Sequence, residues 1–242
     1  MNFFNKGNKA FWAERARLHG KSPHGSWEDT RMMELEFKAL MSYLPQGTKT
    51  ILDIGAGPGH VVHRLQGEGY DACGVEREKQ WRDSERGIFW GEAIPWLEGT
   101  EGRRCPDVIY TVRTLINMPY KEQERAVDLM LQKARKRVIL IEEVEGAREE
   151  MNLLREGLQL HPLEHQEFNL PVNSTSLRRR GFREVSFADV YYFFTRVIGP
   201  LLTRELGYDT IANRLGLSVQ TSNPHAPVGL VCPIRLFWKD TE

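Results

Sequence analysis

The stretch Thr50-Ile51-Leu52-Asp53-Ile54-Gly55-Ala56-Gly57-Pro58-Gly59-His60 decides the fold of this 242-residue chain. A short run of β-branched and aliphatic residues ends at Ile54, and a helix is expected to begin near Pro58 or Gly59. Glycines permit positive φ angles and let a ligand approach the backbone without meeting a Cβ atom. Proline suits a first helical turn, where its missing N–H is not needed. The pattern predicts a strand, a ligand-binding turn and a helix; the alternative is a tight turn that binds nothing.

Strands and helices alternate outward from this turn. The sequence predicts strands at 50–54, 72–75, 87–90, 108–112 and 137–141, and helices at 60–66, 121–134 and 151–160. Short alternating units imply right-handed crossovers and a parallel sheet that helices cover on both faces. We therefore expect a doubly wound α/β fold with a mostly parallel sheet.

The two ends of the chain depart from that alternation. Residues 1–45 predict two helices, at 10–18 and 27–44, ahead of a domain at 46–242 that carries a loop insertion at about 160–176. Residues 182–187 alternate like a strand, and 191–217 are ambiguous, interpreted as the end of a strand followed by a helix. The last strand is predicted at 230–238, and Pro233 within it favours an edge position or a bulge.

An acidic residue, Glu76, ends the strand that follows the glycine turn, about 20 positions after it. A carboxylate at the tip of that neighbouring strand can accept hydrogen bonds from both hydroxyls of a ribose. A solvated strand end is the alternative interpretation. Nucleotide folds share this arrangement, so the glycine spacing has to distinguish them.

That spacing is GxGxG at Gly55, Gly57 and Gly59, not the GxGxxG of dehydrogenases, and after Leu-Asp-Ile it resembles motif I of class I S-adenosylmethionine-dependent methyltransferases. The resemblance covers about residues 50–142. It implies S-adenosylmethionine as cofactor and a Rossmann-like sheet of seven strands, of which the sequence itself indicates six. It also implies cofactor contacts from the turn and from the next strand tips: Asp53, Gly55, Ala56, Gly57, Gly59 and Glu76, with Glu92 and Ala93 at the adenine, and Thr111 and Val112 beside the methionine moiety.

A closer resemblance is to a subgroup of these enzymes found in bacterial sugar or polysaccharide biosynthesis. It is carried by RTLINMP at 113–119 with Gln123, by MNLLREGL at 151–158 and by YYFFTR at 191–196. The SWED segment at 26–29 is similar to one that caps the cofactor there, which implies a cofactor contact for Trp27 and an N-terminal helical lid. Ala56 replaces the cysteine usual in that motif, a common variant.

Methyl transfer mainly demands alignment of nucleophile, methyl group and sulfur, and a hydroxyl acceptor also needs a base. His165, in the insertion expected to cover the cleft, is the first candidate base, and a surface histidine is the alternative; His161 is a weaker candidate. Arg113, at a strand tip, is expected to bind an anionic or hydroxyl-rich substrate, unless it forms a structural ion pair with Glu142 or Glu143. Expected substrate contacts are Asn117, Asn152, Arg155, Tyr192 and Arg196.

Composition narrows the classes of function. Lys plus Arg equals Asp plus Glu at 33 each, whereas general nucleic-acid binders usually show a basic excess. Asn117-Met118-Pro119-Tyr120 superficially resembles the NPPY motif of adenine amino-methyltransferases but arrives about six residues late. The three cysteines form no CxxC pair, so we expect neither a disulfide framework nor a metal site.

No apolar run approaches the roughly 20 residues of a membrane span, so we expect a cytoplasmic protein without a membrane partner. A homodimer is compatible with the sequence. The function expected is methyl transfer from S-adenosylmethionine to a small molecule, with a hydroxyl of a sugar or related metabolite preferred. The alternatives are an RNA or DNA methyltransferase and a non-catalytic module that binds S-adenosylmethionine.

Overall fold

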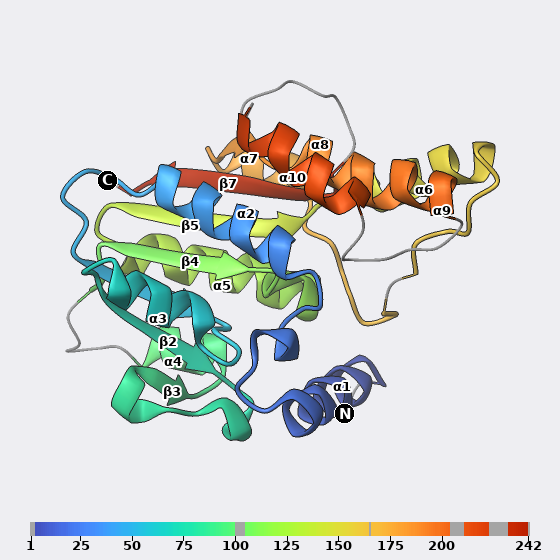
Figure 1. Ribbon diagram of the computed structural model, residues 1–242. Coiled ribbons are helices and arrows are strands. Elements are labelled where there is room, and N and C mark those ends of the chain that lie inside the picture. The colour runs from blue at the N-terminus through green and yellow to red at the C-terminus, as the bar shows by residue number, and fades with distance from the viewer. Residues whose placement is uncertain (1–2, 100–104, 165, 204–210, 223–231, 242) are drawn as a thin grey trace.

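A seven-stranded sheet forms the centre of the protein, seen in a computed structural model that describes residues 3–99, 105–164, 166–203, 211–222 and 232–241 (Figure 1). The strand order is β3-β2-β1-β4-β5-β7-β6. β7 pairs antiparallel with β5 and β6, whereas all other neighbours are parallel. The strands are β1 (Thr50–Ile54), β2 (Asp71–Glu76), β3 (Ile88–Trp90), β4 (Val108–Val112), β5 (Arg137–Glu143), β6 (Arg183–Val185) and β7 (Ile234–Asp240). The expected seven-stranded, mostly parallel sheet is confirmed, with one strand reversed.

Helices cover both faces of this sheet, α2 and α3 on the face nearer the viewer in Figure 1 and α4 and α5 on the other. α1 and α6 lie beyond the carboxyl ends of the parallel strands. The helices are α1 (Phe3–His19), α2 (Thr30–Ser42), α3 (His60–Gly67), α4 (Ala93–Glu98), α5 (Tyr120–Lys133), α6 (Ala147–Gly157), α7 (Ser174–Arg179), α8 (Asp189–Phe193), α9 (Gly199–Thr203) and α10 (Ile211–Ser222).

The strand β5 shows why the sheet needs cover on both faces. Ile139 and Ile141 join the core under α2 and α3, while Val138 and Leu140 join the core under α4 and α5. All four side chains are fully buried. Successive side chains of a strand point to opposite faces, so an unbroken apolar run is stable only between two layers of helices.

Two N-terminal boundaries differ from the prediction. α1 begins at Phe3 rather than at residue 10. α2 begins at Thr30 and not at Trp27, because the carboxylate of Asp29 accepts a hydrogen bond of 3.0 Å from the backbone N–H of Met32 and so caps the helix. Trp27 therefore precedes α2. Buried residues of α2 belong to the core.

Several C-terminal predictions were wrong. β7 lies between β5 and β6, not at an edge, and Pro233 precedes the strand, where its missing N–H removes no ladder bond. Tyr191 lies in α8, which continues through a π-helical turn at Phe194–Ile198 into α9, so no strand ends there. α7 occupies the end of the expected loop insertion, and α4 was not predicted.

Candidate functional site

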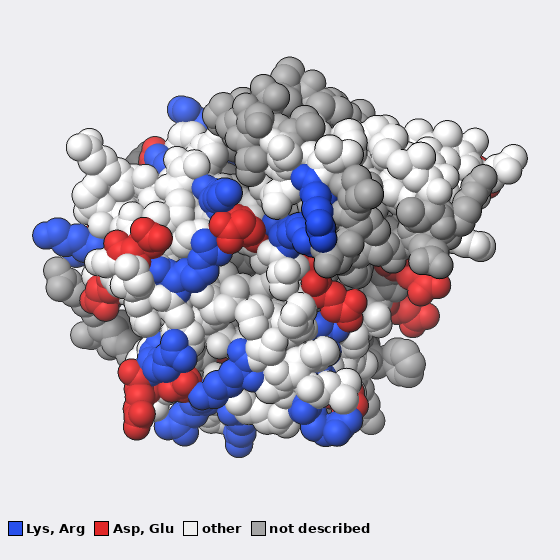
Figure 2. All heavy atoms as spheres, in the orientation of Figure 1, with Lys and Arg blue, Asp and Glu red and all other residues white. Residues whose placement is uncertain are grey.

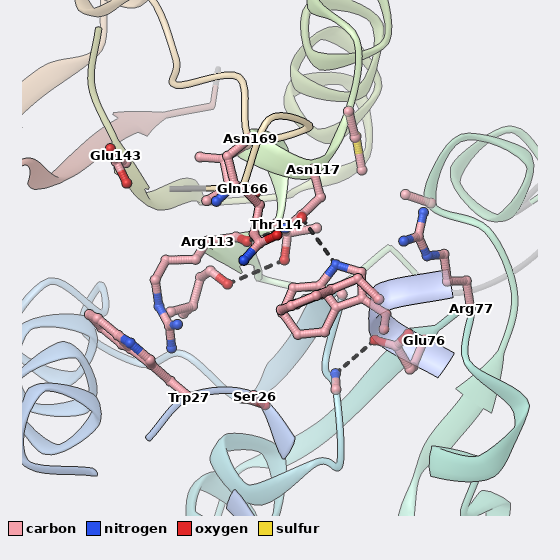
Figure 3. A pocket seen from close by; sticks show the side chains of 18 of the residues that line it. Ser26, Trp27, Glu76, Arg77, Arg113, Thr114, Asn117, Glu143, Gln166 and Asn169 are labelled. Atoms are coloured by element: carbon pink, nitrogen blue, oxygen red, sulfur yellow. Dashed lines mark hydrogen bonds between the residues drawn. The ribbon is translucent and has the colours of Figure 1, made fainter. Parts of the chain in front are cut away.

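A cavity of about 650 Å³ opens at the carboxyl edge of the parallel strands (Figure 3). Two groups of lining residues define its ends. Those at the glycine-loop end are Gly55, Gly57, Glu76, Arg77, Glu92 and Ala93, and those at the β5 end are Glu143, Arg148, Gln166, Asn169, Tyr192, Pro233 and Ile234. Figure 3 shows Glu76 and Arg77 on one side of the view and Glu143 on the other.

The glycine turn leaves β1 with backbone angles that side chains rarely adopt. Gly55 has φ +82°, Gly57 has φ +55° and Gly59 has φ +83°. A Cβ atom at Gly57 would also lie 2.7 Å from the hydroxyl oxygen of Ser26. Both the backbone conformation and the space therefore require glycine at this position.

Glu76, at the tip of β2, holds this turn in place. One carboxylate oxygen accepts a hydrogen bond of 2.8 Å from the backbone N–H of Gly57, and the other accepts one of 2.8 Å from the N–H of Glu78. The residue is buried, and burial raises its pKa while these two N–H groups lower it. The carboxylate thus points at the turn, and each oxygen keeps acceptor capacity for a further partner.

Four residues expected to contact a cofactor do not line the cavity: Asp53, Ala56, Gly59 and Thr111. Asp53 lies on the sheet face under α2 and α3, where one carboxylate oxygen accepts a 2.7 Å hydrogen bond from Tyr110 and the other has no partner. Burial raises the pKa of Asp53 to about 7. Alternation along β1 explains this position, because Asp53 points sideways from the strand and not beyond its end.

α1 forms one wall of the cavity through Lys9, Phe11, Trp12 and Arg15. The indole N–H of Trp12 donates a 3.1 Å hydrogen bond to the side-chain oxygen of Asn117, and the amide of the buried Asn8 donates one of 2.7 Å to the backbone oxygen of Asn117. At the glycine-loop end, Lys9 pairs with Glu92 at 3.1 Å. These contacts tie α1 to the strand tips.

Arg113 follows β4 and lines the cavity, and it has a left-handed φ of +51°. Its guanidinium lies 4.0 Å above the ring of Trp27 and donates two hydrogen bonds, of 2.9 and 3.3 Å, to the carboxylate of Glu36 on α2. The suggested partners Glu142 and Glu143 were wrong. Glu142 accepts backbone N–H groups of residues 114–116, and burial raises its pKa to about 7.

At the β5 end, Glu143 and Arg148 form a forked ion pair. A third guanidinium nitrogen of Arg148 donates a 2.7 Å hydrogen bond to the backbone oxygen of Glu164, which fixes the segment after α6. Tyr192 is buried beside them, and burial raises its pKa well above the ordinary range. Sequence reasoning missed Glu143, Arg148, Gln166 and Asn169. The available signal for the first two was an acidic residue at the end of a buried strand with an arginine five positions later.

Three residues expected to bind substrate lie outside the cavity lining: Asn152, Arg155 and Arg196. Asn152 exchanges hydrogen bonds with the backbone of Leu163. Arg155 donates to the backbone oxygens of His161 and Arg196. Arg196 pairs with Asp29 at 3.0 Å, with both side chains buried. Their side chains join segments of the protein rather than facing open space.

The residues that the structure does bring together in the lining are Trp27, Gly55, Gly57, Glu76, Glu92, Ala93, Val112, Arg113, Asn117 and Tyr192. His165, the candidate base, lies outside the described residues. Within the described ranges there is no group of three or more His, Cys, Asp or Glu side chains that could hold a metal ion. Within them, too, every helix is too short or too polar to cross a membrane.

The sheet order, the reversed β7 and the glycine turn at the carboxyl edge define a Rossmann-like α/β fold. No protein-family model and no curated protein sequence matches the chain. Solved structures do match the chain.

A S-adenosylmethionine-dependent methyltransferase from Archaeoglobus fulgidus has a TM-score of 0.60 and 11% identity, over 91% of this chain and 100% of that one. The plantazolicin methyltransferase BamL, solved with S-adenosylhomocysteine, has a TM-score of 0.53 and 12% identity, over 98% and 97%. The methyltransferase domain of a bacterial CtHen1 has a TM-score of 0.52 and 8% identity, over 87% and 99%. The chain therefore has the fold of S-adenosylmethionine-dependent methyltransferases.

Proposed function

We propose that this protein transfers the methyl group of S-adenosylmethionine to a small molecule, and that the acceptor atom is a hydroxyl oxygen of a sugar or related metabolite. One observation carries the proposal: the Glu76 carboxylate accepts a hydrogen bond from the N–H of Gly57, in a turn whose glycine positions leave little room for a Cβ atom. A ribose diol can donate to that carboxylate, and the bare backbone can approach the rest of the ligand closely.

The cavity also suits this ligand in size and composition. Its volume of about 650 Å³ lies within the roughly 300–1,000 Å³ of small-molecule sites. Glu92 and Ala93 line the same end of the cavity as Glu76, which supports adenine contacts from them, and Val112 lines the cavity at the tip of β4. The β5 end remains for an acceptor.

The bound cofactor would supply an activated methyl group, and the protein would supply alignment. Gly55 and Gly57 would let the ligand lie against the backbone, and α1 would exclude water from above as the N-terminal lid. Asn117 and Tyr192 could hydrogen-bond an acceptor hydroxyl. His165 remains the proposed base for its proton.

A nucleic-acid methyltransferase is the weaker candidate. Each Lys or Arg of the described cavity lining has a carboxylate within ion-pairing distance, so no free cation remains there for a phosphate: the pairs are Lys9–Glu92, Arg15–Glu28, Arg77–Glu78, Arg113–Glu36, Arg125–Glu98 and Arg148–Glu143. Figure 2 shows Lys and Arg interspersed with Asp and Glu on the face it displays, not gathered in a stripe. Phosphate recognition normally needs such a stripe.

Calorimetric titration of the full chain tests the proposal. We expect S-adenosylmethionine to bind with one molecule per chain, and NAD to give no heat. Transfer of a radiolabelled methyl group is then measured with a neutral sugar extract and with total RNA as acceptor pools. Absence of cofactor binding would reject the site, and labelling of RNA alone would replace the acceptor class. Binding without transfer to either pool would favour a non-catalytic module.

A further inference from the structure

Three arginine–carboxylate pairs surround the segment that carries Trp27. They are Arg15–Glu28 at 3.8 Å, Arg113–Glu36 at 2.9 Å and Arg196–Asp29 at 3.0 Å. The charges of these three pairs sum to zero, so together they add no net charge around this segment. Removal of one carboxylate would leave a net positive charge beside the cavity.

Arg15 and Arg113 both line the cavity, but only Arg113 of these two has a buried carboxylate partner, because Glu36 is buried whereas Glu28 is exposed. The guanidinium of Arg113 lies over the ring of Trp27, and its Nε and one Nη donate to the two carboxylate oxygens of Glu36. The next residue, Thr114, fills the space above Gly55, which places the pair beside the glycine turn. Figure 3 shows Arg113 reaching down to Trp27.

Arg113 is the neighbour that stabilises the ionised form of Glu36. The side chain of Glu36 is 4% exposed, and that of Arg113 is 15% exposed. Burial and, to a smaller extent, Asp29 raise the pKa of Glu36 above its ordinary value, and the charge and hydrogen bonds of Arg113 oppose this rise. Burial lowers the pKa of His60 to about 4, and the positive charge of Arg113 contributes to this lowering.

We propose that Glu36 is a positioning residue that holds Arg113 against Trp27 and cancels its charge, so that the cavity can accept a cationic cofactor. This inference rests on the proposed function. S-adenosylmethionine carries a positive sulfonium, whereas the product S-adenosylhomocysteine has a neutral thioether. An uncompensated Arg113 would repel the first ligand and not the second, because charges interact strongly across a wall of low dielectric constant. Glu36 would thus set the preference for substrate cofactor over product.

The test is the ratio of the two dissociation constants, for S-adenosylmethionine over S-adenosylhomocysteine, measured by calorimetry at low salt. Glu36→Gln should raise this ratio about tenfold relative to the unmodified protein, since the neutral amide leaves Arg113 uncompensated. Glu36→Asp keeps the charge, so it should restore the ratio even if both affinities fall. Equal changes of both dissociation constants in Glu36→Gln would overturn the proposal.

Asp107→Asn is the matched control. Asp107 is also a buried carboxylate paired with an arginine, Arg135 at 2.7 Å, but it precedes β4 at the opposite edge of the sheet. Its loss should lower stability and leave the ratio unchanged. A shifted ratio in this control would show that the readout follows general destabilisation, and that would overturn the proposal. If the unmodified protein binds neither ligand, the proposed function itself fails.

Breaking a buried pair can unfold a protein, whereas replacing both partners with apolar residues is often tolerated. Should Glu36→Gln not fold, two double variants replace it. E36M/R113M carries no charge at these positions, and E36M/R113K carries one uncompensated cation. The ratio should be about tenfold higher in the second variant, and equal ratios would overturn the proposal.

Discussion

The two ends of the cavity are built from different materials. The glycine-loop end is a backbone cradle, formed by the turn at residues 55–59, in which the N–H of Gly57 donates to the carboxylate of Glu76 from the next strand. The β5 end is built from side chains that come from separate segments: Glu143 at the end of β5, Arg148 in α6, Gln166 and Asn169 beyond α6, and Tyr192 in α8.

This difference predicts different consequences of mutation. Substitution of a glycine in the backbone cradle changes the shape of the turn directly, because Gly55 and Gly57 have left-handed φ angles and an added Cβ would meet Thr114 or Ser26. The side chains at the β5 end are held by ion pairs, and removal of one partner of a buried ion pair lowers the free energy of unfolding. We therefore expect substitutions at the glycine-loop end to change ligand affinity, and substitutions at the β5 end to change stability.

The largest effect is expected for Gly57→Val. Valine cannot adopt φ +55° without strain, and its Cβ would collide with Ser26. Affinity for S-adenosylhomocysteine should fall by about 100-fold or more, measured by calorimetry. Gly67→Ala is the control, because a Cβ there meets nothing within 4 Å. Near-normal binding by Gly57→Val would mean that the ligand lies elsewhere.

The glycine-loop end was also the part that the sequence predicted. β1 was predicted with its observed bounds, and the turn and Glu76 were placed together, because the signal lies in a contiguous stretch and one spaced acid. The β5 end could not be predicted in this way. Glu143 and Arg148 are only five positions apart, but nothing local shows that β7 and α8 complete their surroundings.

Asp53 marks the limit of motif reasoning within the predicted region. The motif includes Asp53, yet strand alternation directs its side chain to the face covered by α2 and α3, toward Tyr110. Arg155 and Arg196 show the same limit at the other end. Their residue types suit ligand binding, but both side chains are buried. Arg155 donates to a backbone oxygen and Arg196 donates to Asp29.

The second prediction sharpens the comparison within the cradle. Glu76→Gln keeps the shape but replaces one acceptor oxygen with an NH₂ donor. That donor must face the N–H of either Gly57 or Glu78, which distorts the turn. Affinity for S-adenosylhomocysteine should fall about 30-fold. Glu78→Gln is the control, since only the backbone of Glu78 bonds Glu76; equal losses in both variants would contradict the cradle.

The third prediction concerns the β5 end. Glu143→Gln leaves the guanidinium of Arg148 without its counter-charge at a position only 17% exposed. The free energy of unfolding should fall by about 2 kcal/mol, measured by urea titration, while affinity for S-adenosylhomocysteine changes less than about twofold. Glu150→Gln, at an exposed position of the same helix α6, should change neither quantity. A large loss of affinity for S-adenosylhomocysteine in Glu143→Gln would contradict the expectation that substitutions at the β5 end change stability and not ligand affinity.

The smallest effect is expected for Asp53→Asn, because Asp53 belongs to the sequence motif but does not line the cavity. The pKa of Asp53 is raised to about 7 in the folded protein, above the roughly 3.9 of an unfolded chain. The folded state therefore holds the extra proton between these values, and the stabilising contribution of Asp53 is lost as the pH rises through about 7. Asparagine removes this dependence while it can still accept the hydrogen bond of Tyr110. Relative to the unmodified protein, the variant should gain on the order of 1 kcal/mol in free energy of unfolding between about pH 5 and about pH 7, measured by urea titration at each pH.

The control for this pH dependence is Asp71→Asn. Asp71 lies at the exposed start of β2, so its variant should show no such gain. The affinity of Asp53→Asn for S-adenosylhomocysteine should change less than about threefold. A larger loss would mean that Asp53 acts on the ligand through the turn, and that the cradle extends back into β1 as far as Asp53.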